Sequence, residues 1–444
     1  MDLEELILQE ISEPSIPDRE FLITEFGAIA DGKSDCTDAF EKAIDTLTDI
    51  GGGKIVVPAG EYLTGPIHIK SNIELHLETG ARIKFIQDPH KYLPVVLTRF
   101  EGMELYNYSP FIYAYDQQNI AVTGSGELDG QSDNQHWWFW KGKEEFGWQD
   151  GLPEQSSDVK RLSQMARDQV PVEKRIFGAG HYLRPNFIQF YRCSNVLIDG
   201  IKIVDSPMWC IHPVMCTNVI IRNVRIESQG PNNDGINPES CTYVLIENCH
   251  LDTGDDSIAI KSGKNEDGRR INMPSQYILI RNNVVHSKHS HGGVVIGSEM
   301  SGGVKNVLAY QNVFINLERV LRIKTNTVRG GFVDNIFFKN NVAVNISHEA
   351  IVVDSLYDGE TGSNPPIVRN IYVEEFKCIN AKYGLLIKAS GECKIGNIVM
   401  ENSHISSVNT PLWVENAEQV FIRKCSFNNL CIEELVIRGS LKLL

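Results

Sequence analysis

The amino-acid sequence predicts an all-β protein, a parallel β-helix with a short helical cap at its N-terminus. Short runs of residues with strand-like alternation recur nine times, at intervals of 23 to 35 residues. Each run is a strand pattern, a turn residue such as Asn or Gly, and a second strand pattern. A period near 25 residues with occasional longer steps is typical of coils stacked along one axis. Residues one period apart in sequence then become neighbours in space, about 4.8 Å apart.

The repeated runs begin mostly at an Asn or Tyr residue. They start at Asn195, Asn218, Tyr243, Tyr277, Asn306, Asn335, Asn370, Asn397 and Val420. A leucine-rich repeat would place Leu at fixed positions and include a helical segment, and this sequence shows neither pattern. We interpret the Asn residues as structural, with side chains that hydrogen-bond from coil to coil.

Two segments depart from the repeat within a predicted single domain of residues 1–444. Residues 1–60 form the predicted cap, with a helix over 34–47, Ser34 as a possible N-cap and the glycines 51–53 at its end. Residues 131–183 form an aromatic-rich insertion with a helix-like stretch at 156–168. This insertion is longer than structural loops usually are. It is either a packed appendage or oligomer contact, or a wall over a cleft that offers aromatic surface to sugar rings.

Composition excludes several classes of function. The net charge of −15 makes nucleic acid a poor partner, because phosphate contacts need a basic surface. A local basic patch can still bind an anion, since the Debye length is about 8 Å at physiological salt. We expect that the acidic N-terminus is not a secretory signal, and no apolar run is long enough to span a membrane. Because we expect no secretory signal, we also expect reduced thiols and a cytoplasmic protein. The ten cysteines show no metal-binding CxxC spacing, and we expect no metal and no cofactor.

Four short polar segments fall on successive predicted coils, and together they predict an active site. They are Asn232-Asn233-Asp234-Gly235, Gly254-Asp255-Asp256, Ser290-His291-Gly292 and Arg322-Ile323-Lys324. Each segment alone is more often structural: Asp-Asp pairs are common on surfaces, and Asn-Asn-Asp-Gly is a turn signal. In this order and at coil-like spacing, stacking would place three carboxylates, one imidazole and two cations on one flank.

Such a flank has the chemistry of a glycoside hydrolase. Cleavage needs an acid to protonate the leaving oxygen and a base to activate water. Crowded carboxylates cannot all ionise easily, so at least one should have a raised pKa and keep a proton. Arg322 and Lys324 lie two residues apart and point the same way on a strand, which fits recognition of a sugar carboxylate.

The four segments resemble the signature of the polygalacturonases, glycoside hydrolase family 28. That signature is N-T-D, D-D, G-H-G and R-I-K, in this order, on a right-handed parallel β-helix. Residues 26–44 resemble the family's N-terminal opening, and the segment Ser-Pro-Met-Trp at 206–209 resembles its S-P-x-W. The aromatic insertion, together with the expected lack of a secretory leader, resembles the bacterial intracellular exo-acting branch.

The resemblance implies a role for each matching residue. Asp255 would be the general acid, Asp234 and Asp256 would hold and deprotonate the attacking water, and His291 would tune or orient the acid. The substrate-binding residues would be Asn232, Arg322, Lys324, Tyr357, Trp209 and His212. Asn233 in place of Thr and Ser290 in place of Gly depart from the signature, and this leaves fine substrate preference open.

The function predicted from the sequence is inverting, exo-acting hydrolysis of α-1,4-linked polygalacturonate or oligogalacturonate, with release of galacturonic acid. Other acidic pectic fragments, such as rhamnogalacturonan, remain alternative substrates. A calcium-dependent pectate lyase and a non-catalytic β-helix are further alternatives. The insertion and the C-terminal strand could each support a homo-oligomer.

Overall fold

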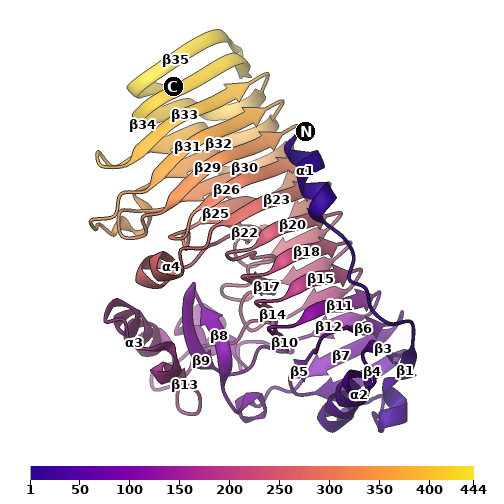
Figure 1. The fold of residues 1–444 in the computed structure, drawn as a ribbon. Helices are drawn as coiled ribbons and strands as arrows, with labels where there is room; N and C mark the ends of the chain where they lie inside the picture. The colour runs from indigo at the N-terminus through magenta and orange to yellow at the C-terminus, as the bar shows by residue number, and fades with distance from the viewer. Residues whose placement is uncertain (1) are drawn as a thin grey trace. The chain divides into compact units, whose positions relative to one another are not determined.

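The computed structural model describes residues 2–444, and it confirms the predicted parallel β-helix (Figure 1). The chain divides into two compact units. The N-terminal unit is Gln9–Asn237, and the C-terminal unit is Pro238–Leu444 with the N-terminal residues up to Leu8. Each unit consists of coils whose strands pair in parallel with those of the next coil. The single domain over 1–444 stays a prediction.

The N-terminal unit has three parallel ladders. The first consists of β1 (Glu20–Leu22), β3 (Gly53–Val57), β6 (Ile73–Leu77), β11 (Gln118–Gly124), β15 (Ser194–Asp199) and β18 (Thr217–Arg222). The second consists of β2 (Asp31–Asp35), β4 (Gly60–Thr64), β7 (Ala81–Phe85), β12 (Glu127–Asp129), β16 (Lys202–Val204) and β19 (Arg225–Ser228). The third consists of β5 (Ile67–His68), β10 (Ile112–Tyr115), β14 (Ile188–Tyr191) and β17 (Ile211–Val214).

The C-terminal unit repeats this arrangement. Its first ladder is β20 (Thr242–Glu247), β23 (Ser275–Arg281), β26 (Val304–Tyr310), β29 (Phe332–Lys339), β31 (Ile367–Glu374) and β33 (Lys394–Glu401). The second begins with β21 (His250–Thr253), β24 (Val284–His286) and β27 (Val313–Ile315), and the third with β22 (Ile258–Ile260), β25 (Val294–Gly297) and β28 (Leu321–Lys324). Both continue into the long strands β30 (Val342–Asp354), β32 (Lys377–Lys388) and β34 (His404–Phe427). The antiparallel strand β35 (Leu430–Leu443) pairs with β34 at the C-terminal end.

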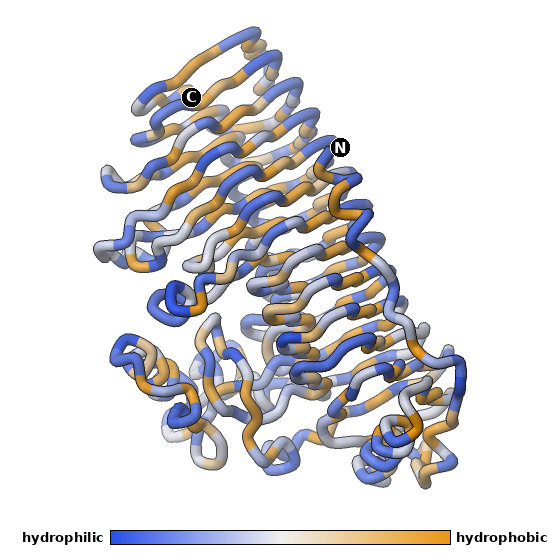
Figure 2. The backbone as a smooth tube through the Cα atoms, viewed as in Figure 1, coloured by the Kyte–Doolittle hydropathy of each residue, from blue (hydrophilic) through white to orange (hydrophobic). Residues whose placement is uncertain are grey.

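The coils are held by apolar columns inside and by asparagine ladders at the turns. Val244 and Ile246 of β20 stack in register on Ile278 and Ile280 of β23, and all four side chains are fully buried. The same alternation of apolar and polar residues repeats along successive coils (Figure 2). Burial of such side chains is the main favourable term in folding.

The predicted asparagine ladders are confirmed. The Asn218 side chain donates to Asn195 Oδ1 at 2.9 Å, and Asn335 donates to Asn306 Oδ1 at 2.6 Å. These residues have positive φ, a backbone conformation that asparagine adopts more readily than most residues. The repeated Asn therefore supplies both the turn and a side-chain bond to the next coil.

The predicted cap helix is α2 (Thr37–Asp49). Its apolar face, which includes Phe40, Ile44 and Leu47, is buried and packs against β3, β5 and β6. The suggested N-cap at Ser34 is wrong, because Ser34 lies in β2 and the helix begins three residues later. The Asp35 carboxylate instead accepts a hydrogen bond from the backbone N–H of Thr37 at 3.0 Å.

The aromatic insertion packs on a small side sheet of β8 (Val96–Phe100), β9 (Met103–Asn107) and β13 (Ile176–Phe177). The predicted helical stretch is α3 (Ser156–Arg167), whose Leu162 and Ala166 join a buried cluster with Phe177. Short 3-10 helices precede and follow it: η3 (Trp138–Lys141), η4 (Glu144–Phe146) and η5 (Val172–Lys174). Trp137 and Trp140 are buried, so these two rings pack the insertion and offer no surface to a sugar.

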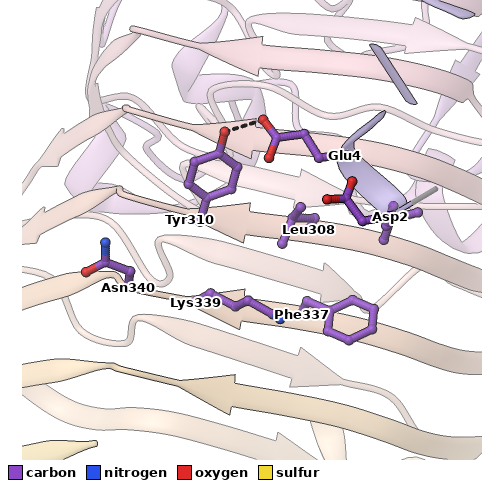
Figure 3. A pocket seen from close by; sticks show the side chains of 8 residues that line it. Asp2, Glu4, Leu308, Tyr310, Phe337, Lys339 and Asn340 are labelled. Carbon is purple, nitrogen blue, oxygen red and sulfur yellow. Dashed lines mark hydrogen bonds between the residues drawn. The ribbon is translucent and has the colours of Figure 1, made fainter. Parts of the chain in front are cut away.

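The N-terminal helix α1 (Leu3–Glu10) is tied to the outer face of the C-terminal unit. Glu4 accepts hydrogen bonds from Tyr310 at 2.5 Å and from Arg281 at 2.9 Å. A pocket of about 460 Å³ adjoins this contact, with Phe337 and Lys339 on its far side (Figure 3).

The described helices include none that is long and apolar enough to cross a membrane. All ten cysteines are free thiols, and nine of them are buried.

Candidate active site

In the C-terminal unit, the third ladder brings together the predicted residues of three sequence segments. Asp255 and Asp256 directly precede β22, His291 precedes β25, and Arg322 and Lys324 lie in β28. The register pairs Ile258 with Val294, and Val295 with Arg322, so the three segments occupy successive coils. The predicted stacking of Asp-Asp, His and Arg-Ile-Lys is therefore confirmed within this unit.

Asp256 is a buried carboxylate held by cations. Its Oδ2 lies 2.6 Å from Lys324 Nζ, and its Oδ1 lies 3.8 Å from Arg322 Nη1. The side chain is only 1% exposed. Burial alone would lower the pKa of Lys324, but the Asp256 charge outweighs it and the pKa is raised. Within residues 2–444, Asp256 Oδ1 accepts no hydrogen bond, which suits it to receive a proton.

Asp255 faces a different partner and is more open. Its Oδ1 lies 3.1 Å from Nδ1 of His291, and its side chain is 17% exposed. Burial raises the pKa of Asp255, but the His291 hydrogen bond, the His291 charge and the charges of Lys324 and Lys261 outweigh this, so the pKa lies below its usual range. The same hydrogen bond raises the pKa of His291.

The raised pKa expected of at least one crowded carboxylate is therefore not found at Asp255, the expected general acid, in the free protein. Repulsion among carboxylates would raise the pKa, but the His291 imidazole within hydrogen-bond distance of Asp255 has the opposite and larger effect. In this structure the single proton of the pair belongs to His291, and Asp255 is its carboxylate partner. A proton is thus stored 3.1 Å from the predicted acid and can pass to it along one hydrogen bond.

We expect the activity to depend on pH through this pair. The pair holds one proton between the lowered Asp255 pKa, below 3.8, and the raised His291 pKa, above 6.5. Below the lower limit it gains a second proton, and above the upper limit it loses its only one. The ratio kcat/KM should therefore fall as the pH rises above the His291 pKa, and the pH profile measures this.

The variant His291→Asn tests the assignment. Asp255 must then hold the proton itself, so the high-pH limb should move to lower pH. The exposed neighbour His289 offers a control, and His289→Asn should leave the profile unchanged. An unchanged high-pH limb in His291→Asn would show that the imidazole does not store the proton.

Tyr357 also joins this group, in the 3-10 helix η6 (Tyr357–Gly359). Its ring centre lies 5.5 Å from Arg322 Cζ and 5.3 Å from Lys324 Nζ, within the range of cation–π attraction. Burial raises the pKa of its hydroxyl. The aromatic ring and the two cations therefore lie together. This agrees with the substrate-binding role that the family resemblance implies for Tyr357.

The Asn-Asn-Asp segment lies in the N-terminal unit. Asp234 is 2% exposed, and its Oδ2 accepts a hydrogen bond from Asn237 Nδ2 at 3.0 Å. Asn232 is half-buried, and its Oδ1 accepts from Arg184 Nη2 and from Lys141 Nζ, each at 2.8 Å. Two cations are thus anchored at the turn that carries Asp234.

The two departures from the family signature are structural. Asn233 is fully buried, where its Oδ1 accepts from Ser228 Oγ at 2.6 Å and from the Gly230 N–H at 2.9 Å. Ser290 is also fully buried, and its Oγ lies 2.8 Å from Ser257 Oγ on the preceding coil. Both side chains brace turns, and neither reaches the surface where a substrate would bind.

Trp209 and His212 are buried as well. His212 is fully buried, and its Nδ1 lies 2.9 Å from both Asn186 Nδ2 and Gln189 Nε2. The Trp209 ring meets the imidazole edge to face at 4.8 Å and is 3% exposed. Burial favours a packing role for these two residues over the predicted contact with substrate.

Gly292, just before β25, fits closely against Val295 and lies beside Asp256. A Cβ atom at this position would lie 2.4 Å from Val295 Cγ2 and 3.4 Å from Asp256 Oδ1. We expect Gly292→Ala to displace the turn and lower kcat on the order of 100-fold, the cost of about 1 Å of misplacement. Gly391 has open space around it, so Gly391→Ala is the matched control. Equal kcat values for the two variants would contradict this role.

A second buried ion pair, which the sequence analysis does not predict, lies in the same unit. Lys261 Nζ lies 3.1 Å from Glu299 Oε2, and both residues are buried. Burial raises the Glu299 pKa, but the charges of Lys261, Lys264, Arg329 and Lys324 outweigh it and leave the pKa well below its usual range. The sequence contains a signal for Lys261, because residues 258–261 read I-A-I-K and resemble the L-R-I-K of residues 321–324.

Comparison with known proteins gives a consistent result. The model of the family "Glycosyl hydrolases family 28" matches residues 178–367, a range that contains all four polar segments. A curated relative named "Probable polygalacturonase" from Vitis vinifera is 32% identical over 71% of this chain, and the match spans 59% of that relative's length. The "Exo-poly-alpha-D-galacturonosidase" of Dickeya chrysanthemi is 26% identical over 92% of this chain and 71% of its own length.

A solved structure resembles the whole chain. The crystal structure of a hyperthermoactive exopolygalacturonase from Thermotoga maritima superposes with a TM-score of 0.98 and 55% sequence identity. The match covers 100% of this chain and 99% of the Thermotoga chain. The family 28 exopolygalacturonase of Yersinia enterocolitica, at 22% identity and a TM-score of 0.74, shares the fold.

Proposed function

The chain belongs to glycosyl hydrolase family 28, and from this premise we propose that it is an exopolygalacturonase. It hydrolyses the glycosidic bonds of polygalacturonate from the end of the chain and releases galacturonic acid. The observation that carries this function is the pairing of two adjacent carboxylates with different partners, Asp255 with His291 and Asp256 with Lys324.

We propose that Asp255 protonates the leaving glycosidic oxygen. The proton comes from the His291–Asp255 pair, where the hydrogen bond allows it to move to the carboxylate as the glycosidic bond breaks. Asp255 is the more open of the two carboxylates, 17% exposed against 1% for Asp256, which suits contact with a leaving group.

We further propose that Asp256 and Asp234 activate the attacking water. Lys324 stabilises the Asp256 carboxylate in its ionised form, and Asp256 Oδ1 remains able to accept a proton. Water gives a proton to this base and bonds to the anomeric carbon, while the bond from that carbon to the leaving oxygen breaks. The leaving oxygen takes the proton from Asp255, so the overall reaction consumes one water and inverts the anomeric centre.

Arg322, Lys324 and Tyr357 are suited to the sugar next to the scissile bond. A guanidinium and an ammonium bind a galacturonate carboxylate, and the tyrosine ring offers an apolar face to the sugar. Asp256 faces both cations, and a galacturonate carboxylate would add a second anion that a neutral sugar lacks, which favours a uronate in this subsite.

The stereochemistry of the product tests the mechanism. We expect proton NMR during the first minutes of hydrolysis to show the β-anomer of the new reducing end, because direct attack by water inverts the α-linkage. The α-anomer as the first product would mean a covalent intermediate and would contradict the roles given to Asp234 and Asp256.

A further inference from the structure

Lys141 is the last residue of η3, in the aromatic part of the insertion. The residues around it are firmly anchored in the N-terminal unit. Trp137 and Trp140 are buried and meet edge to face at 5.0 Å. Trp138 donates its indole N–H to the Ser206 carbonyl at 2.8 Å. The backbone that carries Lys141 is therefore fixed by three tryptophans.

Trp138 also fits closely against the turn that carries Asp234. A Cβ atom added to Gly230 would lie 2.2 Å from Cε2 of the Trp138 ring, so this ring packs directly on the glycine. Gly230 in turn donates its N–H to Asn233 Oδ1. The insertion and the Asn-Asn-Asp turn thus form one packed structure, and residue 141 is placed relative to Asp234 with little freedom.

The Lys141 ammonium is held at Asn232 by a neutral acceptor. Its Nζ donates to Asn232 Oδ1 at 2.8 Å, and the same oxygen accepts from Arg184 Nη2. Arg184 is 1% exposed and also donates to the carbonyls of Pro207 and Pro231, so it braces the turn from inside. Lys141 is half-buried, so part of its side chain reaches the surface.

We propose that Lys141 is a substrate-binding residue, which contacts the carboxylate of a galacturonate unit bound beside Asn232. This inference rests on the proposed function and extends it to the insertion. The Lys141 cation is held at Asn232, two residues before Asp234 in the sequence. It attracts a uronate locally, although the chain carries a net charge of −15. The aromatic residues of the insertion then act as its anchor, and the lysine is the group that meets the sugar.

A substrate-binding role and a purely structural role for Lys141 have different kinetic consequences. A lysine that only braced Asn232 would affect kcat and stability through the Asp234 turn. A lysine that binds a substrate carboxylate affects KM, and its effect is screened by salt.

The test compares Lys141→Met, which keeps the side-chain stem, with Lys141→Arg, which keeps the charge. We expect Lys141→Met to raise KM for tri-galacturonate on the order of 10-fold, with kcat within about twofold and an unchanged melting temperature. Lys141→Arg should recover most of the loss. The rise of KM with salt should be less steep in Lys141→Met than in the wild type.

A matched control lies two residues away. Lys143 is on the same insertion but is exposed and paired with Glu145 at 3.2 Å, so Lys143→Met should leave KM unchanged. An unchanged KM in Lys141→Met would overturn the proposal. A fall in kcat and melting temperature with a normal KM would also overturn it, in favour of a brace. Failure of the wild-type protein to hydrolyse polygalacturonate would instead refute the proposed function.

Discussion

Replacement of Asp255 by Asn should lower kcat on the order of 1,000-fold or more, with the fold intact. The amide cannot protonate the leaving oxygen. It also cannot receive the proton of His291 and pass it on, as the Asp255 carboxylate does. The substitution is nearly isosteric, so KM should change little. Initial rates on polygalacturonate, together with circular dichroism and thermal melting, measure both parts of this expectation.

The control for Asp255→Asn is Asp334→Asn, on the outer face of β29. Asp334 accepts hydrogen bonds from Arg369, at 2.8 and 2.9 Å, and has no part in the proposed chemistry. Its replacement should leave kcat within about twofold of the wild type, as expected for a surface ion pair. Near-normal turnover by Asp255→Asn would remove Asp255 from the role of acid.

Lys324→Met should reduce both activity and stability. Lys324 is the buried partner of Asp256 at 2.6 Å, and removal of one partner from a buried ion pair costs about 3–5 kcal/mol. The free energy of unfolding should fall by about that amount. The ratio kcat/KM should fall on the order of 100-fold or more, because the base and the uronate-binding surface both lose a charge.

Lys339→Met is the corresponding control. Lys339 pairs with Glu374 at 3.0 Å, but its side chain is 39% exposed, so the loss should be below about 1 kcal/mol. The double variant Lys324→Met with Asp256→Asn separates the two effects. If the ion pair matters for stability, this double variant should be more stable than Lys324→Met alone, because no charge stays buried. Additive destabilisation would argue against the pairing.

The fold could be predicted from the sequence because the strand pattern recurs along it at near-regular intervals. Each coil repeats the same alternation, and Asn at the turns such as Asn195 and Asn306 fixes both the positive φ and the ladder bond. The helix over 37–49 was equally predictable from its apolar spacing. The insertion was predictable as an interruption only, because its packing on β8, β9 and β13 involves no repeat.

The site was predictable in composition and order, and less so in its electrostatics. The coil spacing indicated that Asp256, His291 and Lys324 meet, and the register confirms it. The proton assignment failed because it depends on a 3.1 Å contact between Asp255 and His291 that spacing alone does not specify. Lys141 was missed because it lies in the insertion, outside the repeat, and its partner Asn232 is 91 residues away. The Lys261–Glu299 pair, 38 residues apart, could have been found from the I-A-I-K of residues 258–261.

The products formed at the start of polygalacturonate digestion test the central claim most directly. Anion-exchange chromatography of early time points should show galacturonic acid as the only small product, with the polymer shortened slowly. A ladder of intermediate oligomers at the same stage would contradict exo-hydrolysis. Products that absorb in the ultraviolet, as unsaturated lyase products do, would contradict hydrolysis itself.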